Sequence, residues 1–110
     1  MISRELIAAS STILILSILE ENDSYGYMII KKVKDISKNK IEWTDGMLYP
    51  VLHRLESRGF IDSYWKESSV GRKRKYYKIT GSGKEELKKE KEQWLTVNHA
   101  LNEVWSLNNV

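Results

Sequence analysis

The sequence predicts a mainly α-helical fold that carries one small β-hairpin. Apolar residues recur with helical spacing before residue 60, two short aromatic runs typical of strands follow, and a long charged helical segment closes the chain. At 110 residues, with 41% of them hydrophobic and 30% charged, the chain suffices for one domain with a modest core.

The first helix is expected from its cap, Ser3, to about Glu20. Its centre, the run ILILSIL (13–19), is apolar nearly all round. A chain of this size cannot cover such a helix on every side, so one face is expected on the domain and the other against a second subunit. The sequence therefore predicts a homodimer.

The second helix is expected from about Tyr25 to Ser37, with Ser24 as its cap. The third is expected between a cap at Thr44 and a left-handed terminating residue at Gly59. On a helical wheel of the third helix, one face is apolar and is expected on the core, and the other holds two poor helix formers. The second helix has Tyr25, Ile29, Val33 and Ile36 on one face; the third has Leu48, Val51, Leu52 and Leu55 on the core face and Gly46, Pro50, His53 and Ser57 opposite.

The proline in the third helix has two readings. Pro50 lacks the N–H that would bond the carbonyl of Gly46, so the two residues form one local feature on the exposed face. In one reading Pro50 only limits or tilts the helix. In the other, a slim surface bordered by Tyr49, His53 and Arg54 inserts into the major groove of DNA.

Two strand-like runs, FIDSYWK (60–66) and RKYYKI (74–79), flank a turn near SSVGRK and predict a hairpin. Alternation directs Tyr77 and Ile79 to one face of this hairpin. Its segment GRKRKYYK carries five cations and no acid. At the hairpin tip such cations can reach DNA phosphates, although a charge run that serves only solubility is the alternative. The residues concerned are Arg72, Lys73, Arg74 and Lys75.

The last helix is expected from Gly81 to Leu107, after a cap at Thr80. One stripe of it is apolar, with Asn98 beside the stripe, and packing between subunits is its simplest reading. Helices, hairpin and last helix together predict a winged helix-turn-helix domain (1–80), whose first helix also reaches the dimer interface, and a C-terminal dimerisation helix (81–110). The stripe consists of Leu87, Trp94, Val97, Leu101 and Trp105.

Other classes of protein are disfavoured by composition. The chain has no cysteine, which fits a reducing cytoplasm, and its N-terminal apolar run is short and flanked by glutamates, unlike a signal peptide or membrane span. GSGK (81–84) departs from the phosphate-binding loop, and His53 and His99 lack metal-ligand spacing. We therefore expect no enzyme activity, cofactor, metal or membrane partner.

The motifs YGYMIIKKV, DGMLYPVLHRLESRGFI and GRKRKYYKIT followed by GKEEL resemble the PadR-like transcriptional regulators, in the short form with one C-terminal helix, from Ile13 to about Val104. The resemblance implies a cytoplasmic homodimer that binds a pseudo-palindromic operator in double-stranded DNA, usually as a repressor, and releases it on a signal. A winged-helix module that binds an acidic protein is the alternative. The residues expected at DNA are Tyr25, Lys31, Thr44, Tyr49, Pro50, His53, Arg54, Arg72, Lys73, Arg74 and Lys75.

The run SYWKESSVGRKRKYYKIT and its spacing to Trp94 are similar to the drug-sensing branch of that family. This likeness implies a channel at the dimer centre in which a tryptophan from each last helix sandwiches a planar aromatic compound. Simple dimer packing of Trp94 is the alternative. The wall of the channel would consist of Leu6, Ala9, Ser10, Ile13, Val97 and Asn98.

Overall fold

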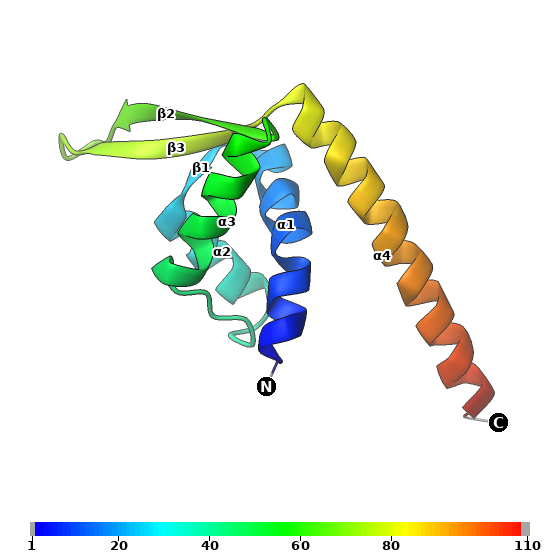
Figure 1. Ribbon diagram of the computed structural model, residues 1–110. Coiled ribbons are helices and arrows are strands. Elements are labelled where there is room, and N and C mark those ends of the chain that lie inside the picture. Colours follow the sequence, from blue (N-terminus) through cyan, green and yellow to red (C-terminus); the bar gives the residue numbers. More distant parts are fainter. Residues whose placement is uncertain (1, 109–110) are drawn as a thin grey trace.

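The computed structural model describes residues 2–108 and confirms the predicted class, with helices around one small sheet (Figure 1). Met1 and residues 109–110, which the sequence assigns to the two terminal segments, lie outside the described residues. The elements are α1 (Arg4–Glu21), β1 (Ser24–Tyr25), α2 (Gly26–Ile36), α3 (Asp45–Ser57), β2 (Ile61–Glu67), β3 (Lys73–Ile79) and α4 (Gly81–Asn108).

The short strand β1 is an addition to the predicted elements. Ser24 was expected to cap α2, but it pairs with Tyr77, and Tyr25 pairs with Tyr76, so the sheet has the order β1-β3-β2. Tyr25 is the N-cap residue of α2 and makes no side-chain capping bond. The prediction of a Ser24 cap was wrong because this backbone finds its partners on the free edge of β3.

The hairpin of β2 and β3 agrees with the predicted alternation. The strands are antiparallel, and their register runs from Ile61 opposite Ile79 to Glu67 opposite Lys73. Tyr77 is buried and Ile79 packs against the core, as expected for one face of the hairpin. The turn contains Gly71 at a φ of 82°, a backbone angle that glycine adopts without strain.

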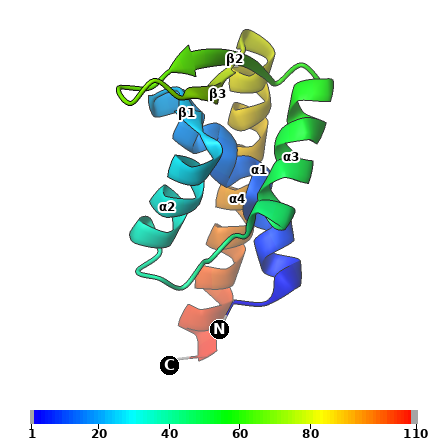
Figure 2. The same ribbon diagram turned by 90° about the vertical axis from the view of Figure 1, so that its left-hand side faces the viewer.

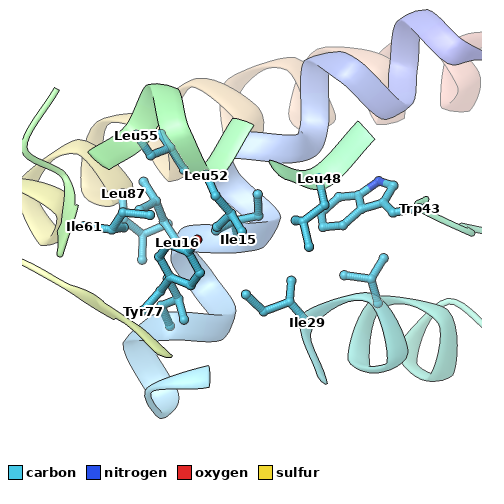
Figure 3. Close-up of a cluster of buried hydrophobic side chains, with 12 residues drawn as sticks. Ile15, Leu16, Ile29, Trp43, Leu48, Leu52, Leu55, Ile61, Tyr77 and Leu87 are labelled. Atoms are coloured by element: carbon cyan, nitrogen blue, oxygen red, sulfur yellow. The ribbon is translucent and has the colours of Figure 1, made fainter. Parts of the chain in front are cut away.

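The core lies where α1, α2, α3 and the sheet meet, and α1 is at its centre (Figure 3). In Figures 1 and 2, α1 lies between α4 and the pair formed by α2 and α3. The buried hydrophobic side chains are Ile15, Leu16, Leu19, Ile29, Val33, Trp43, Leu48, Leu52, Leu55, Ile61, Tyr77 and Leu87.

Two expectations about apolar residues need correction. Leu87, placed on the interfacial stripe, is 1% exposed and belongs to this chain's own core. Ile36 was grouped with Ile29 and Val33, but it is 58% exposed because the last turn of α2 extends past the core. The chain also covers part of α1 by itself, since Ile13 is half-buried against the core while the more N-terminal Leu6 stays exposed.

The ends of α3 and the start of α4 follow the predicted capping residues. The Thr44 hydroxyl accepts a hydrogen bond from the Met47 N–H at 3.3 Å, and Gly59 has a φ of 79°. The Thr80 hydroxyl accepts from the Gly83 N–H at 3.0 Å and donates to the Gly59 carbonyl at 2.6 Å. These bonds join the end of α3 to the start of α4 across the sheet.

Helix α4 runs away from the body of the domain, and the molecule measures 60 × 29 × 21 Å (Figure 1). Its direction depends on close packing at Gly83, where an added Cβ would collide with the Phe60 carbonyl oxygen and lie 2.7 Å from Ile79 Cγ1. Within residues 2–108, no helix is both long and apolar enough to cross a membrane.

Replacing Gly83 by alanine should destabilise the fold. Because the collision involves backbone, the start of α4 must shift, and overpacking of this kind costs about 1–3 kcal/mol. Urea denaturation followed by circular dichroism measures the loss. Gly81→Ala is the matched control, since nothing lies within 4 Å of its added Cβ, and it should change stability by less than about 0.5 kcal/mol. Equal stabilities for the two variants would contradict the packing role of Gly83.

Candidate nucleic-acid interface

The solvent-facing side of α3 presents several side chains that the sequence placed at DNA. Pro50, His53 and Arg54 are exposed, whereas Leu48, Leu52 and Leu55 face the core. The helix continues through Pro50, so the proline neither begins nor ends it. A narrow polar face of α3 is thus free to enter a groove about 12 Å wide, the width of the DNA major groove.

The position of α3 relative to α2 depends on a contact between Tyr49 and Gly26. A Cβ on Gly26 would collide with the Tyr49 hydroxyl and lie 2.8 Å from its Cζ. Glycine therefore lets the Tyr49 ring lie directly on the first turn of α2. This contact brings α3 close to the start of α2, as no larger residue at position 26 would allow.

The four predicted cations of the hairpin divide into two pairs. Arg74 is half-buried: its Nη1 donates to the Tyr25 hydroxyl at 3.1 Å, and its guanidinium lies 4.6 Å from the centre of that ring. Lys75 Nζ lies 4.0 Å from Glu56 Oε1 on α3. Arg72 and Lys73 are exposed and form no salt bridge within the described part of the chain. The prediction that all four stand at the hairpin tip was therefore wrong for Arg74 and Lys75, because the register of the strands places them opposite Lys66 and Trp65, further from the turn.

Three tyrosine rings in contact, one pair tilted and the other stacked, connect the hairpin to the start of α2. The rings of Tyr25 and Tyr76 are 5.2 Å apart, and those of Tyr76 and Tyr64 are 5.7 Å apart. The Tyr64 hydroxyl donates to Asp23 Oδ2 at 2.6 Å, and this hydrogen bond raises the pKa of Tyr64 to about 12. The phenol therefore keeps the proton that it donates to Asp23 throughout the physiological pH range.

Glu56 connects the hairpin to α3. Its Oε2 accepts a hydrogen bond from the Ser63 hydroxyl at 2.5 Å, and its Oε1 faces Lys75. Burial, followed by the nearby Glu56 carboxylate, raises the pKa of Tyr77. The Glu56 carboxylate thus contacts one residue on each strand of the hairpin and links both strands to α3.

A groove of about 440 Å³ lies between the hairpin and the paired helices. It brings together four of the expected DNA-binding residues, but Lys31 lies elsewhere on α2 and the Thr44 hydroxyl is used for capping. Sequence reasoning missed Tyr27 and Trp65, although the aromatic content of FIDSYWK was a usable signal. The lining residues are Tyr25, Gly26, Tyr27, Tyr49, Trp65, Arg74 and Lys75.

A second groove, of about 450 Å³, lies between α1 and α4 and is mostly apolar. It joins Trp94 to three of the residues expected around a ligand, Leu6, Ser10 and Ile13. Ala9, Val97 and Asn98 are exposed and do not line it in the single chain. The remaining lining residues are Ile2, Leu14, Ser17 and Ile41.

Helices α1–α3 followed by a basic hairpin define a winged helix-turn-helix protein, a class that binds DNA through its third helix and its wing. The sequence model of the transcriptional regulator PadR-like family matches residues 15–89, so the chain belongs to that family. It is accordingly a DNA-binding transcriptional regulator and not an enzyme.

Two solved structures of transcriptional regulators, and one further relative, are similar to this chain over most of its length. A transcriptional regulator from Clostridium thermocellum is 34% identical, with a TM-score of 0.84 over 94% of this chain and 97% of that chain. A PadR family transcription regulator from Clostridium difficile is 38% identical, with a TM-score of 0.76 over 86% and 96% of the two chains. An uncharacterized protein of Lysinibacillus sphaericus is 33% identical over 92% of this chain and 93% of its own length.

Proposed function

We propose that this regulator is a cytoplasmic repressor that binds a pseudo-palindromic operator in double-stranded DNA as a homodimer. The observation that carries the proposal is the exposed face of α3, with His53 and Arg54, beside a hairpin whose Arg72 and Lys73 are exposed. An α-helix fits the major groove, and cations on a wing fit the phosphates beside it. The repressor role is supported by the family resemblance.

The residues of this interface would make different kinds of contact with DNA. His53 and Arg54 can contact base edges, while Arg72 and Lys73 contact phosphates. Pro50 keeps the centre of α3 free of a projecting flexible side chain. Tyr25, Tyr49, Arg74 and Lys75 form the wall between the helix and the hairpin. Lys31 and Thr44, which do not line this groove, would contact DNA outside it.

Binding to DNA from the protein's own promoter should weaken steeply as salt rises, because phosphate contacts release counterions. Arg72→Ala should lower the slope of log K against log salt by about one and weaken all sequences alike. His53→Ala should instead change the discrimination between operator variants by about 1–3 kcal/mol. Fluorescence anisotropy of labelled duplexes measures both effects.

Lys89→Ala is the control for this series, because Lys89 is exposed on α4 away from the proposed interface, and it should bind as the unaltered protein does. Absence of binding to every promoter fragment at low salt would refute the regulator's proposed mode of action. It would favour the other reading of the basic hairpin, contact with an acidic protein.

The proposed homodimer is supported by an uncovered apolar stripe on α4. Leu101 is 42% exposed and Trp105 is 54% exposed, and Val97 and Val104 lie on the same side of the helix. Contiguous apolar surface of this kind marks an interface. Two such stripes, or one stripe and the exposed N-terminal part of α1, would cover each other in a dimer.

A charge on this stripe should separate the subunits. Leu101→Glu places a carboxylate in the proposed contact, where its desolvation opposes association. Sedimentation velocity should show a dimer for the unaltered protein and a monomer for this variant. Ser106→Glu, on the opposite face of the same helix, should remain dimeric. A monomer for the unaltered protein would contradict the proposal.

We also propose that a planar aromatic compound releases the operator by binding at Trp94. The apolar groove beside Leu6, Ser10 and Ile13 supports this second activity, since an indole face binds flat aromatic rings. The Ser10 hydroxyl already donates to the Leu6 carbonyl at 2.8 Å, so the wall offers little polar selectivity. Packing of Trp94 between subunits is the competing explanation.

Planar aromatic dyes should quench the tryptophan fluorescence and lower the affinity for operator DNA. Trp94→Ala should abolish both effects, whereas Trp105→Phe, which removes a tryptophan further along α4, should retain them. The comparison is needed because four tryptophans contribute to the signal. Equal quenching in the Trp94→Ala variant would rule out this site.

A further inference from the structure

Trp65 is not part of the core, and although it lines the groove between the hairpin and the helices, no function has been given to it above. The residue is 65% exposed. This exposure is unusual, because burying a tryptophan side chain would remove about 150–250 Å² of surface from water. Its position in β2 explains the exposure. Ile61 and Ser63 precede it on the same face of the strand, and Ile61 is fully buried, but Trp65 is one step further out, where the hairpin has left the body of the domain.

The face of the hairpin that carries Trp65 is the one turned toward α3. Ser63, two residues before Trp65, is bonded to Glu56 of α3, and Lys75 is the cross-strand partner of Trp65. Trp65 therefore overhangs the groove between hairpin and helices that Tyr27 and Tyr49 also line. An indole is thus held over open space on the side that α3 would present to a duplex.

The charges around the groove select its occupant. Its lining includes the cations Arg74 and Lys75 and no carboxylate, and both oxygens of nearby Glu56 already face Ser63 and Lys75. An anion with an adjoining apolar surface fits such walls. The backbone of duplex DNA offers both, because each phosphate is next to a deoxyribose. A base would also stack on indole, but a duplex must first be unstacked to release one.

We propose that Trp65 is a DNA contact of the wing, with its indole packed on a deoxyribose while Arg74 and Lys75 face the neighbouring phosphate. The inference rests on the proposed binding of duplex DNA and adds an apolar contact to an interface otherwise described by charges. A sugar is present in every nucleotide. The contact therefore adds affinity without sequence preference and, since it carries no charge, without salt dependence.

The experiment compares Trp65→Thr, Trp65→Phe and Lys73→Ala in anisotropy titrations with promoter duplexes at several salt concentrations. Threonine suits an exposed strand position, so Trp65→Thr should keep its thermal midpoint. It should weaken binding about tenfold, equally for all operator variants and with an unchanged salt slope. Trp65→Phe should retain most of the affinity, and Lys73→Ala should lower the salt slope by about one.

Three results would overturn the inference. Unchanged affinity of Trp65→Thr would show that the indole does not touch DNA. A changed salt slope in that variant would show that Trp65 acts by positioning the cations. Loss of binding to a protein partner, with DNA affinity intact, would assign the indole to that partner. By contrast, failure of the unaltered protein to bind any promoter duplex at low salt would refute the proposed DNA binding itself.

Discussion

The central position of strand β3 is the constraint on which the DNA-binding half depends. On one edge β3 pairs with β1 at the start of α2, and on the other with β2 of the hairpin. Its alternate residues serve two sides: Tyr77 enters the core, and Tyr76 lies between Tyr25 and Tyr64, tilted against the first ring and stacked on the second. The hairpin is consequently aligned with the start of α2, because β1 pairs with β3 although some fifty residues separate the two strands in sequence.

The parts of the fold that depend on local chemistry were predictable from sequence. Thr44, Gly59 and Thr80 have the conformations or hydrogen bonds expected of them because caps depend on neighbours within a few residues. Strand β1 was not predictable, since two residues form a strand only when a distant edge is available to them. The burial of Leu87 likewise depends on where α4 crosses the core.

The interface residues show the same division. The exposure of His53 and Arg54 could be predicted from the helical wheel of α3. Because the apolar face of that helix packs on the core, residues away from that face must point to solvent. The half-buried position of Arg74 depends on its contact with Tyr25, which is 49 residues away in sequence. No pattern within the basic run distinguishes Arg74 from Arg72. Trp65 was overlooked for a related reason, since its exposure is decided by how far the hairpin extends beyond the core.

If the proposed homodimer is correct, the packing of Gly83 has a consequence for the evolution of operator spacing. With 28 residues, α4 is about 42 Å long, so a tilt of about 10° at its start moves its far end by roughly 7 Å. If α4 joins two subunits, the packing at Gly83 changes the distance between their two α3 helices. Gly83 itself lies far from any base contact. Half-site spacing and base preference could then diverge independently among relatives, each through its own few residues.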